Sequence, residues 1–379
     1  MKVLKHLFCI VSVLFLSSCA TFKKAPFVEQ FPLKIEEVKI NPESFNPALG
    51  EKVKIYYELS KDARVTIRIY DPDCGIITNL LSNEPRKRGL NYETWDGRDF
   101  EKIIIPDQAY FFTIEAEDEA KNTIIYDPIT FSGGQEVDIV DVKYDREAGT
   151  ISFNLPFSAW VLARLGIKNG ALMKTLLDWE PRPKGENIAF WNGKDEGGIT
   201  DLYSHPKFSM MITTMSCLEN SIITIGNNSI SYYEYKKQTS QRRLKKAERP
   251  ILTEKKNFKL SRHYGLPRWK DRASRFSVSF LQITEKTPEG IPIIRGKTLL
   301  NVTLDEKDKE FIIGQRFEIV LYVDDVLYAE EEEGYSPFSW MWDVSGVPDG
   351  EHLLTINIVS LNDQVGTQSL KFMVMNTQD

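Results

Sequence analysis

An internal repeat without gaps constrains the fold of this chain more than any other sequence feature. Residues 151–214 align with residues 55–118 at a constant offset of 96, and "IYYEL" falls on "ISFNL". Apolar positions fall on apolar positions of the same parity, and the alignment continues through Phe112 and Ile114 onto Phe208 and Met210. Because side chains alternate faces along a strand, both copies should bury the same face. A repeat of this size indicates a duplicated domain.

Alternation of apolar and polar residues predicts β-strands in each copy. The apolar positions of the first two runs are Val53, Ile55, Tyr57 and Leu59, then Val65, Ile67 and Ile69, with "SKDA" as the turn between them. Such alternation is typical of half-buried antiparallel strands. No segment of similar length shows helical periodicity, so the sequence predicts an all-β fold.

A tryptophan-glycine motif occurs in both copies. The first copy has Trp95, Asp96, Gly97 and Asp99, and the second has Trp191, Asn192, Gly193 and Asp195. Asp96 and Asp99 could serve as a catalytic pair or as part of a calcium site. Because Asn192 replaces the first acid while the rest is retained, we favour a turn, in which tryptophan closes the sandwich and glycine adopts a positive φ. The carboxylates of Asp99 and Asp195 should then accept bonds from backbone amides of the following loop.

The motifs of the first copy are similar to those of the immunoglobulin-like (Ig-like) domain of the flagellar hook-capping protein. They are "FNP" at 45–47, "VTIRIYDPDCG", the Trp-Asp-Gly-x-Asp cluster and "YFFTIEA". The second copy departs from them, with "IKNG" in place of "DPDCG" and "FSMMITTM" as its closing strand. The resemblance implies an Ig-like β-sandwich for each copy.

Alternation resumes near Phe276 and predicts a third domain. The segment "FSWMWDVSGVPDGEHLL" resembles Ig-like modules at the ends of bacterial surface and polysaccharide-degrading proteins. We therefore predict three Ig-like β-sandwiches in series, at residues 34–133, 136–228 and 276–379. A basic linker is expected at 229–275, and His352 should be a strand residue rather than a metal ligand.

The N-terminus has the pattern of an export signal. Lys2 and Lys5 precede an apolar core from Leu7 to Leu16, which is too short to span a bilayer. The following "LSSC" resembles the lipobox of bacterial lipoproteins, which implies a signal peptide at 1–19, diacylglycerol on Cys19 and a tether at 20–33. An ordinary secretory signal or a short cytosolic helix remains an alternative. Ala20 after the cysteine favours the outer membrane by the same resemblance.

Charge is distributed unevenly along the chain. The stretch from Lys236 to Arg275 has fifteen Lys or Arg and three acidic residues, a balance of +12 in a chain whose net charge is −6. This stretch is a solvated linker, a segment that lies along the acidic faces of its own domains, or a contact for an anionic partner such as lipopolysaccharide, an acidic glycan or an acidic protein. In its second half, Phe258, Tyr264, Leu266 and Trp269 favour partial ordering against a surface. The candidate contact residues are Arg242, Arg243, Lys245 and Lys246.

Motifs for an enzyme or cofactor are not found in the sequence. It has no glycine-rich phosphate loop, no His/Cys metal spacing and no Gly-x-Ser-x-Gly motif, so we expect no catalysis, no cofactor and no metal. Export argues against nucleic acid as a partner. The acidic run Glu330–Glu333, with Asp324 and Asp325, could hold a cation but is better explained as a solvated hairpin loop. A disulfide between Cys74 and Cys217 is left open.

These observations predict a membrane-anchored envelope lipoprotein that acts as a scaffold or as an adhesion and protein-binding module. Its partners would be the membrane, through the lipid, and envelope proteins, surface proteins or anionic glycans. One alternative is carbohydrate recognition through exposed tyrosine and tryptophan. Another is an accessory subunit or hydrolase of envelope polysaccharide.

Overall fold

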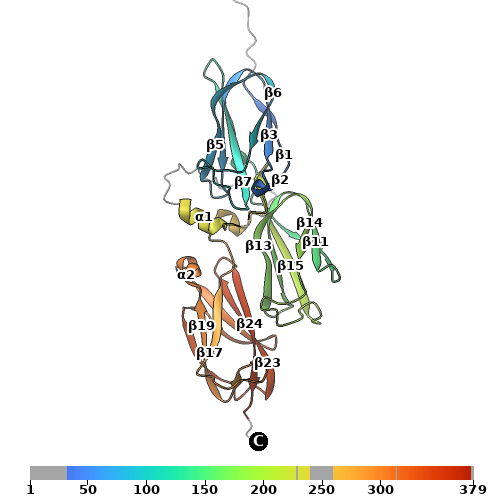
Figure 1. The fold of residues 1–379 in the computed structure, drawn as a ribbon, viewed down its shortest axis with the longest axis vertical. Helices are drawn as coiled ribbons and strands as arrows, with labels where there is room; N and C mark the ends of the chain where they lie inside the picture. The colour runs from blue at the N-terminus through green and yellow to red at the C-terminus, as the bar shows by residue number, and fades with distance from the viewer. Residues whose placement is uncertain (1–31, 228, 240–258, 313, 377–379) are drawn as a thin grey trace, which may run out of the picture. The chain divides into compact units, whose positions relative to one another are not determined.

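The computed structural model describes residues 32–227, 229–239, 259–312 and 314–376. From Leu33 onward the chain forms one compact unit, built from three β-sandwiches (Figure 1). Each sandwich has a three-stranded sheet, a larger sheet and a hydrophobic core of its own. The predicted all-β class of Ig-like sandwiches is confirmed.

The first sandwich combines a sheet of three strands with a larger sheet. The small sheet has the order β1 (Ile35–Asn41), β3 (Val53–Leu59) and β6 (Gly89–Trp95). The larger has the order β2 (Ser44–Phe45), β16 (Ile222–Thr224), β7 (Ala109–Glu117), β4 (Ala63–Tyr70) and β5 (Ile76–Arg86), with β8 (Thr123–Tyr126) beside β7. Strand β3 buries every second residue, as its alternation predicts, and β4 buries the same parity on the facing sheet.

The second sandwich repeats this plan. Its small sheet has the order β10 (Lys143–Asp145), β11 (Thr150–Leu155) and β14 (Gly185–Phe190). Its larger sheet has the order β13 (Leu172–Arg182), β12 (Ala159–Ile167), β15 (Phe208–Ser216) and β9 (Glu136–Ile139).

The third sandwich has the same two layers. Its small sheet has the order β17 (Phe276–Leu281), β19 (Lys297–Leu304) and β22 (Phe338–Asp343). Its larger sheet has the order β18 (Ile293–Ile294), β24 (Val365–Val374), β23 (Gly350–Ser360), β20 (Phe317–Val323) and β21 (Val326–Glu331). Short helical segments complete the chain: α1 (Tyr232–Thr239), α2 (Glu306–Ile312), and 3-10 turns at Pro47–Leu49, Pro128–Thr130 and Arg262–Gly265.

The register of the closing strands corrects the offset of the repeat. Strand β4 pairs Ile67 with Ile114 of β7, and β12 pairs Ala163 with Ile212 of β15. Ile67 and Ala163 are equivalent at an offset of 96, so Ile114 corresponds to Ile212 at an offset of 98 and not to Met210. The loop before β15 is therefore longer by two residues. Because two residues restore the same parity, the buried face is unchanged.

Strand β16 crosses the predicted boundary between the first two sandwiches. Residues 222–224 were expected in the second domain, but Ile222 and Ile223 pair with Tyr110 and Ala109 of β7. Both isoleucines are fully buried, and Thr224 Oγ1 accepts a bond from Gln108 N at 3.0 Å. The strand satisfies backbone groups at the edge of β7 and buries apolar area there, which explains its position.

The predicted basic linker is partly an ordered element of the fold. Its described residues, 229–239 and 259–275, contain helix α1 and a 3-10 turn. Tyr232, Tyr233, Tyr235 and His263 are buried. The alternative of a solvated linker is therefore wrong for these residues. The expected partial ordering of the second half is confirmed, since Tyr264 packs against the cluster that contains Trp160 and Trp179, while Phe258 lies outside the described residues.

Candidate functional site

The tryptophan motif of the first sandwich forms a turn after β6. Trp95 is buried, and its Nε1 donates to the carbonyl of Arg98 at 3.0 Å. The Asp96 carboxylate accepts from Arg98 N at 3.2 Å. Gly97 has a φ of 71°, and a Cβ there would lie 2.4 Å from a Pro47 side-chain atom, so glycine is required on two grounds.

The second sandwich builds the same turn with a different first residue. Trp191 Nε1 donates to the carbonyl of Lys194 at 2.7 Å. The Asn192 side-chain oxygen accepts from Lys194 N at 3.1 Å, and Gly193 has a φ of 80°. Asp96 and Asn192 thus supply the same side-chain oxygen acceptor. The turn needs this oxygen but does not need a group that can ionise.

The final acids of the two motifs organise the next loop. Asp99 Oδ1 accepts from the backbone amides of Glu101 and Ile103 at 2.9 and 3.0 Å. Asp195 Oδ1 accepts from Ile199 N and Thr200 N at 2.6 and 3.1 Å. Each carboxylate replaces bonds that these amides would otherwise make with water.

The other oxygen of Asp99 belongs to a group that we call the acidic end: Asp71, Asp73 and Asp99 of the first sandwich, all buried. Helix α1 supplies a partner to each. Lys236 Nζ lies 2.5 Å from Asp71 Oδ2, Tyr232 OH donates to Asp73 Oδ2 at 2.9 Å, and Tyr235 OH donates to Asp99 Oδ2 at 3.1 Å. Burial raises the pKa of Asp71, and the attraction of Lys236 acts against this rise.

The spacing of the helix explains how it makes these contacts. Residues three and four apart lie on one face of a helix, so Tyr232, Tyr235 and Lys236 point together at the acidic end. Ser231 Oγ accepts from Glu234 N at 3.2 Å, and Glu234 Oε2 accepts from Ser231 N at 3.4 Å, which is a capping box. The Ser-x-x-Glu spacing was visible in the sequence and is the signal that could have revealed this helix.

The opposite face of α1 contacts α2 of the third sandwich. Tyr233 OH donates to Glu310 Oε2 at 3.0 Å, and Lys237 Nζ lies 3.2 Å from Glu310 Oε1. Lys307 Nζ lies 3.3 Å from Glu234 Oε1. Helix α1 therefore bonds to the first and the third sandwich at once.

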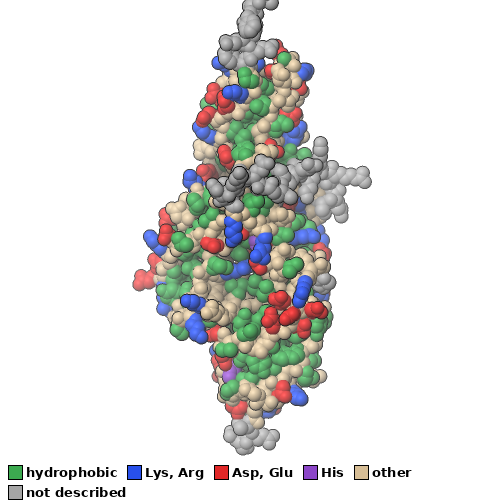
Figure 2. All heavy atoms as spheres, turned by 180° about the vertical axis from the view of Figure 1, so that it is seen from behind, with side chains coloured by type: hydrophobic (Ala, Val, Ile, Leu, Met, Phe, Trp, Pro, Cys, Tyr) green, Lys and Arg blue, Asp and Glu red, His purple; other side chains and the backbone are tan. Residues whose placement is uncertain are grey.

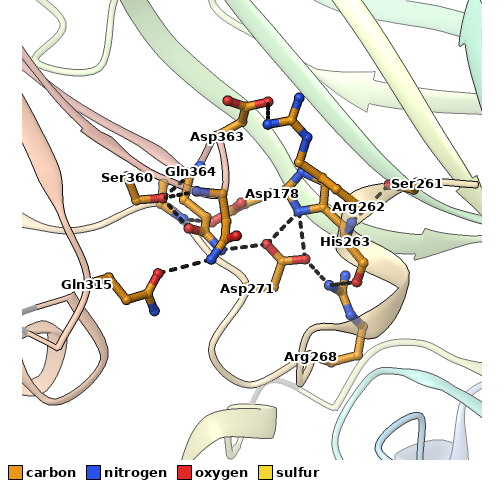
Figure 3. Close-up of polar contacts among 12 residues, drawn as sticks. Asp178, Ser261, Arg262, His263, Arg268, Asp271, Gln315, Ser360, Asp363 and Gln364 are labelled. Carbon is orange, nitrogen blue, oxygen red and sulfur yellow. Dashed lines mark hydrogen bonds and ion pairs between the residues drawn. The ribbon is translucent and has the colours of Figure 1, made fainter. Parts of the chain in front are cut away.

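A second polar group, the His263 cluster, joins the second half of the basic segment to the third sandwich (Figure 3). It consists of His263, Arg268, Asp271 and Gln364, all buried. Asp271 Oδ1 accepts from His263 Nδ1 at 2.8 Å and from Gln364 Nε2 at 2.9 Å, and Asp271 Oδ2 is bonded by Arg268. Gln364 precedes β24, whereas the other three residues come from the connecting segment.

Burial governs the charge state of this histidine. Desolvation, together with the positive charges of Arg268 and Arg164, lowers the pKa of His263 to about 4. Neutral His263 can still donate from Nδ1 to Asp271. The ring packs on Trp179 of β13 with centroids 4.5 Å apart, so the second sandwich also contributes to this site.

A cleft of about 460 Å³ lies beside the His263 cluster. Its acidic lining residues are Asp178, Glu196 and Asp305, with Arg272 and Arg275 among the others. Burial raises the pKa of Asp178, which accepts from Ala273 N at 2.8 Å. Glu196 pairs with Lys174 at 3.1 Å. The cleft thus holds carboxylates that are partly engaged by the protein itself.

The remaining predicted residues separate into two groups. Cys19 and the four basic residues Arg242, Arg243, Lys245 and Lys246 lie outside the described residues. His352 lies on β23 as expected, with Nδ1 2.6 Å from Asp324 Oδ2. Cys74 and Cys217 are buried in different clusters, and burial raises the pKa of the Cys217 thiol.

The described residues contain neither a metal-binding cluster nor a membrane-spanning helix. In that part of the chain, no three His, Cys, Asp or Glu side chains are grouped so that they could hold a metal ion. In the same residues, no helix has the length and apolar character needed to cross a membrane.

No protein-family model matches the chain, and no curated protein matches it significantly. Among solved structures, an endo-β-1,4-mannanase from Thermotoga petrophila is 21% identical, with 27% of this chain and 20% of that chain covered and a TM-score of 0.20. The chain thus spans about one fifth of the mannanase. The fibronectin(III)-like modules of CbhA from Clostridium thermocellum are 9% identical, with 89% and 94% covered and a TM-score of 0.19.

A structure of a bacterial ice-binding adhesin is 13% identical, with 92% of this chain and 100% of that chain covered and a TM-score of 0.19. At these TM-scores the similarities assign no function. The class of the protein is therefore assigned from its own sheet topology, as an all-β chain of Ig-like sandwiches.

Proposed function

We propose that this chain is a lipid-anchored lipoprotein of the bacterial envelope that acts as a structural scaffold or adhesion module. The observation that carries the proposal is the use of charged and tyrosine side chains as internal braces. Lys236 and Tyr235 bond to the acidic end, Tyr233 bonds to α2, and Asp271 bonds to Gln364. These polar side chains, which in another protein could take part in catalysis, bond the first and third sandwiches to the segment that connects the domains.

Bracing of this kind suits a protein that must transmit or resist force between an anchor and a partner. In the proposal, Cys19 carries the lipid, Ala20 favours the outer membrane, and the first two sandwiches are modules of the hook-capping type. The partner is an envelope protein, a surface protein or an anionic glycan, and no cofactor takes part.

The anchor is tested by labelling cells with radioactive palmitate. The wild type should incorporate the label, and Cys19→Ala should not incorporate it and should retain its signal peptide. A second variant, Cys9→Ala, is the matched control, because Cys9 lies inside the predicted signal and should leave labelling unchanged. Label in Cys19→Ala would refute the lipobox, while chemical crosslinking in intact cells tests the scaffold role separately.

One observation favours carbohydrate recognition as a second candidate. Tyr56 and Tyr92 lie side by side on the outer face of β3 and β6, with ring centroids 5.8 Å apart. Tyr92 is 56% exposed, and Lys54 Nζ lies 4.9 Å from the centre of its ring. Aromatic rings of this kind can stack on sugar rings. A glycan array with wild type and Tyr92→Ala tests this candidate, and equal signals from both would exclude the pair.

The proposal that the protein is not an enzyme has its own test. Asp178 is the carboxylate to test as a catalytic acid, because it lines the cleft and burial raises its pKa. Hydrolysis of envelope polysaccharide by the wild type but not by Asp178→Asn, with both variants folded, would show that the scaffold role is incomplete.

A further inference from the structure

The edge strand β21 of the third sandwich begins with three consecutive exposed apolar residues. In the described chain it pairs with β20 and forms one end of its sheet. Val326, Leu327 and Tyr328 are 66%, 56% and 41% exposed. An exposed apolar edge strand presents backbone donors and acceptors that can pair with another strand.

The corresponding edges of the first two sandwiches are protected. Strand β5 contains Pro85 and β13 contains Pro181, and proline cannot donate to a sheet. Each of these strands also has three register shifts against its neighbour, whereas β21 has one and contains no proline. This edge of the third sandwich therefore lacks the proline that the duplicated sandwiches share.

The single irregularity in β21 is a β-bulge that positions an aromatic side chain. Leu327 pairs with Tyr322 and Ala329 with Leu321, so Tyr328 is the extra residue. Its ring lies 5.4 Å from that of Trp342 and 6.3 Å from that of Trp340, both on β22. Trp342 is buried and Trp340 is half-buried, so the apolar surface continues from Tyr328 on one sheet to Trp340 on the other.

Acidic residues lie at both ends of this apolar edge. Glu330 and Glu331 end β21, and Glu332 and Glu333 follow it, so the run begins within the strand and not in a hairpin loop as predicted. Arg316 offsets part of this charge through a contact of 3.7 Å to Glu332. Asp324 lies in the turn before β21. Figure 2 shows hydrophobic side chains gathered on the third sandwich, with acidic side chains beside them.

This charge pattern argues against a second copy of the chain as the partner. In an antiparallel pair of two β21 strands centred on Tyr328, Asp324 of one copy would lie opposite Glu332 of the other. In a parallel pair, Glu330 would lie opposite Glu330. Like charges opposite each other destabilise a sheet.

We propose that β21 is a docking edge for an extended segment of a protein partner in which Lys or Arg alternates with apolar residues. Backbone bonds would extend the sheet from β21, apolar side chains would cover Tyr328 and Trp340, and basic side chains would pair with Glu330 and Glu333. This inference rests on the proposed binding role and names its partner class, but it does not depend on the lipid.

The test uses the purified full-length chain and a fluorescent ten-residue peptide of alternating Lys and Val. Binding should weaken by about tenfold in Glu330→Lys/Glu333→Lys, because two attractive contacts become repulsive. The matched control is Glu147→Lys/Glu186→Lys, which makes the same charge change at exposed residues of the second sandwich and should change binding less than about twofold.

A second peptide separates strand pairing from charge alone. It has the same sequence but carries N-methyl groups on alternate residues, so that one edge of the extended peptide has no backbone N–H to donate to β21. It should bind about tenfold more weakly, because backbone bonds contribute to the affinity. Hydrogen exchange of residues 326–331 should slow in the presence of the unmodified peptide.

Equal binding of both peptides, no binding, or protection from exchange elsewhere in the chain would each overturn the proposal. The scaffold role would survive such a result if crosslinking in cells still recovered a partner. Conversely, peptide binding at β21 in a protein that fails palmitate labelling would leave this inference intact and refute the anchor.

Discussion

Lys236 Nζ lies 2.5 Å from Asp71 Oδ2, although the two residues are 165 positions apart in the chain. The aspartate side chain is 3% exposed and the lysine side chain is 21% exposed. Asp71 Oδ1 also accepts from Asp73 N and Gly75 N at 2.9 and 2.8 Å. This ion pair links helix α1 to the loop after β4, so the first sandwich depends on residues beyond the second.

Replacing Lys236 should therefore destabilise the first sandwich. Lys236→Met keeps the length of the side chain but leaves Asp71 buried without its cation, which should cost about 3–5 kcal/mol. Chemical denaturation followed by tryptophan fluorescence measures this. Lys237→Met is the matched control, because Lys237 contacts exposed Glu310 and should change stability little. Equal effects of the two substitutions would contradict the role of the ion pair.

The tryptophan turns provide a second prediction. Trp95→Ala or Trp191→Ala should each cost about 3–5 kcal/mol and lower the melting temperature of its own sandwich, since each removes a large buried side chain. Calorimetry of the full chain measures the loss. Asp96→Asn should be mild, because Asn192 makes the same bond in the second copy. A stable Trp95→Ala protein would contradict the structural role of the ring.

The sandwiches could be predicted from the sequence because their signals are local. Alternation along β3 and β4 defines which face is buried, and the repeat carries that pattern into β11 and β12. The two-residue insertion before β15 escaped detection because it preserves parity. Strand β16 escaped because its three residues pair with a strand more than a hundred positions earlier, and such pairing depends on tertiary structure.

The braces could be predicted only in part. Contact of the basic stretch with acidic faces of its own domains was one of its predicted roles, but helix α1 and its individual partners were not predicted. The segment around α1 is short and basic, and a helix of eight residues is marginal by itself. Its stability comes from Asp71, Asp73 and Asp99, which are distant in sequence. The capping box of Ser231 and Glu234 was a local signal of a helix start, but nothing local indicated what the helix would contact.

Two histidines should give opposite dependences of stability on pH. His263 has a folded pKa lowered to about 4 by burial and by Arg268 and Arg164, with Asp363 and Glu136 opposing. The unfolded state then binds more protons between about pH 6.5 and pH 4, so stability falls as pH falls through that window, on the order of 2 kcal/mol. Urea denaturation across this range should show a flatter profile for His263→Asn.

His352 is the comparison within the same chain. Although partial burial acts against its charge, the bonds to Asp324 and to the Pro348 carbonyl raise its pKa. Its contribution is present below the unfolded pKa of about 6.5 and is lost as pH rises through the folded value. His352→Asn should therefore flatten the profile above pH 6.5. A His352→Asn protein whose stability above pH 6.5 still follows the wild type would contradict this role. Likewise, if the stability of His263→Asn falls between about pH 6.5 and pH 4 as in the wild type, His263 is not the group responsible.

The basic segment divides into residues with different expected roles. Lys236 is an internal brace, whereas Arg242, Arg243, Lys245 and Lys246 remain the predicted contacts for an anionic partner. Replacing these four with Gln should reduce binding to purified envelope fractions at low salt, where exposed charge contacts are weakly screened. The melting of all three sandwiches should stay unchanged, because these contacts do not stabilise the hydrophobic cores. Binding of the wild type should likewise fall as salt is raised. If the fourfold variant binds as tightly as the wild type at low salt, the partner contacts the sandwiches instead, and the β21 edge is the first surface to test.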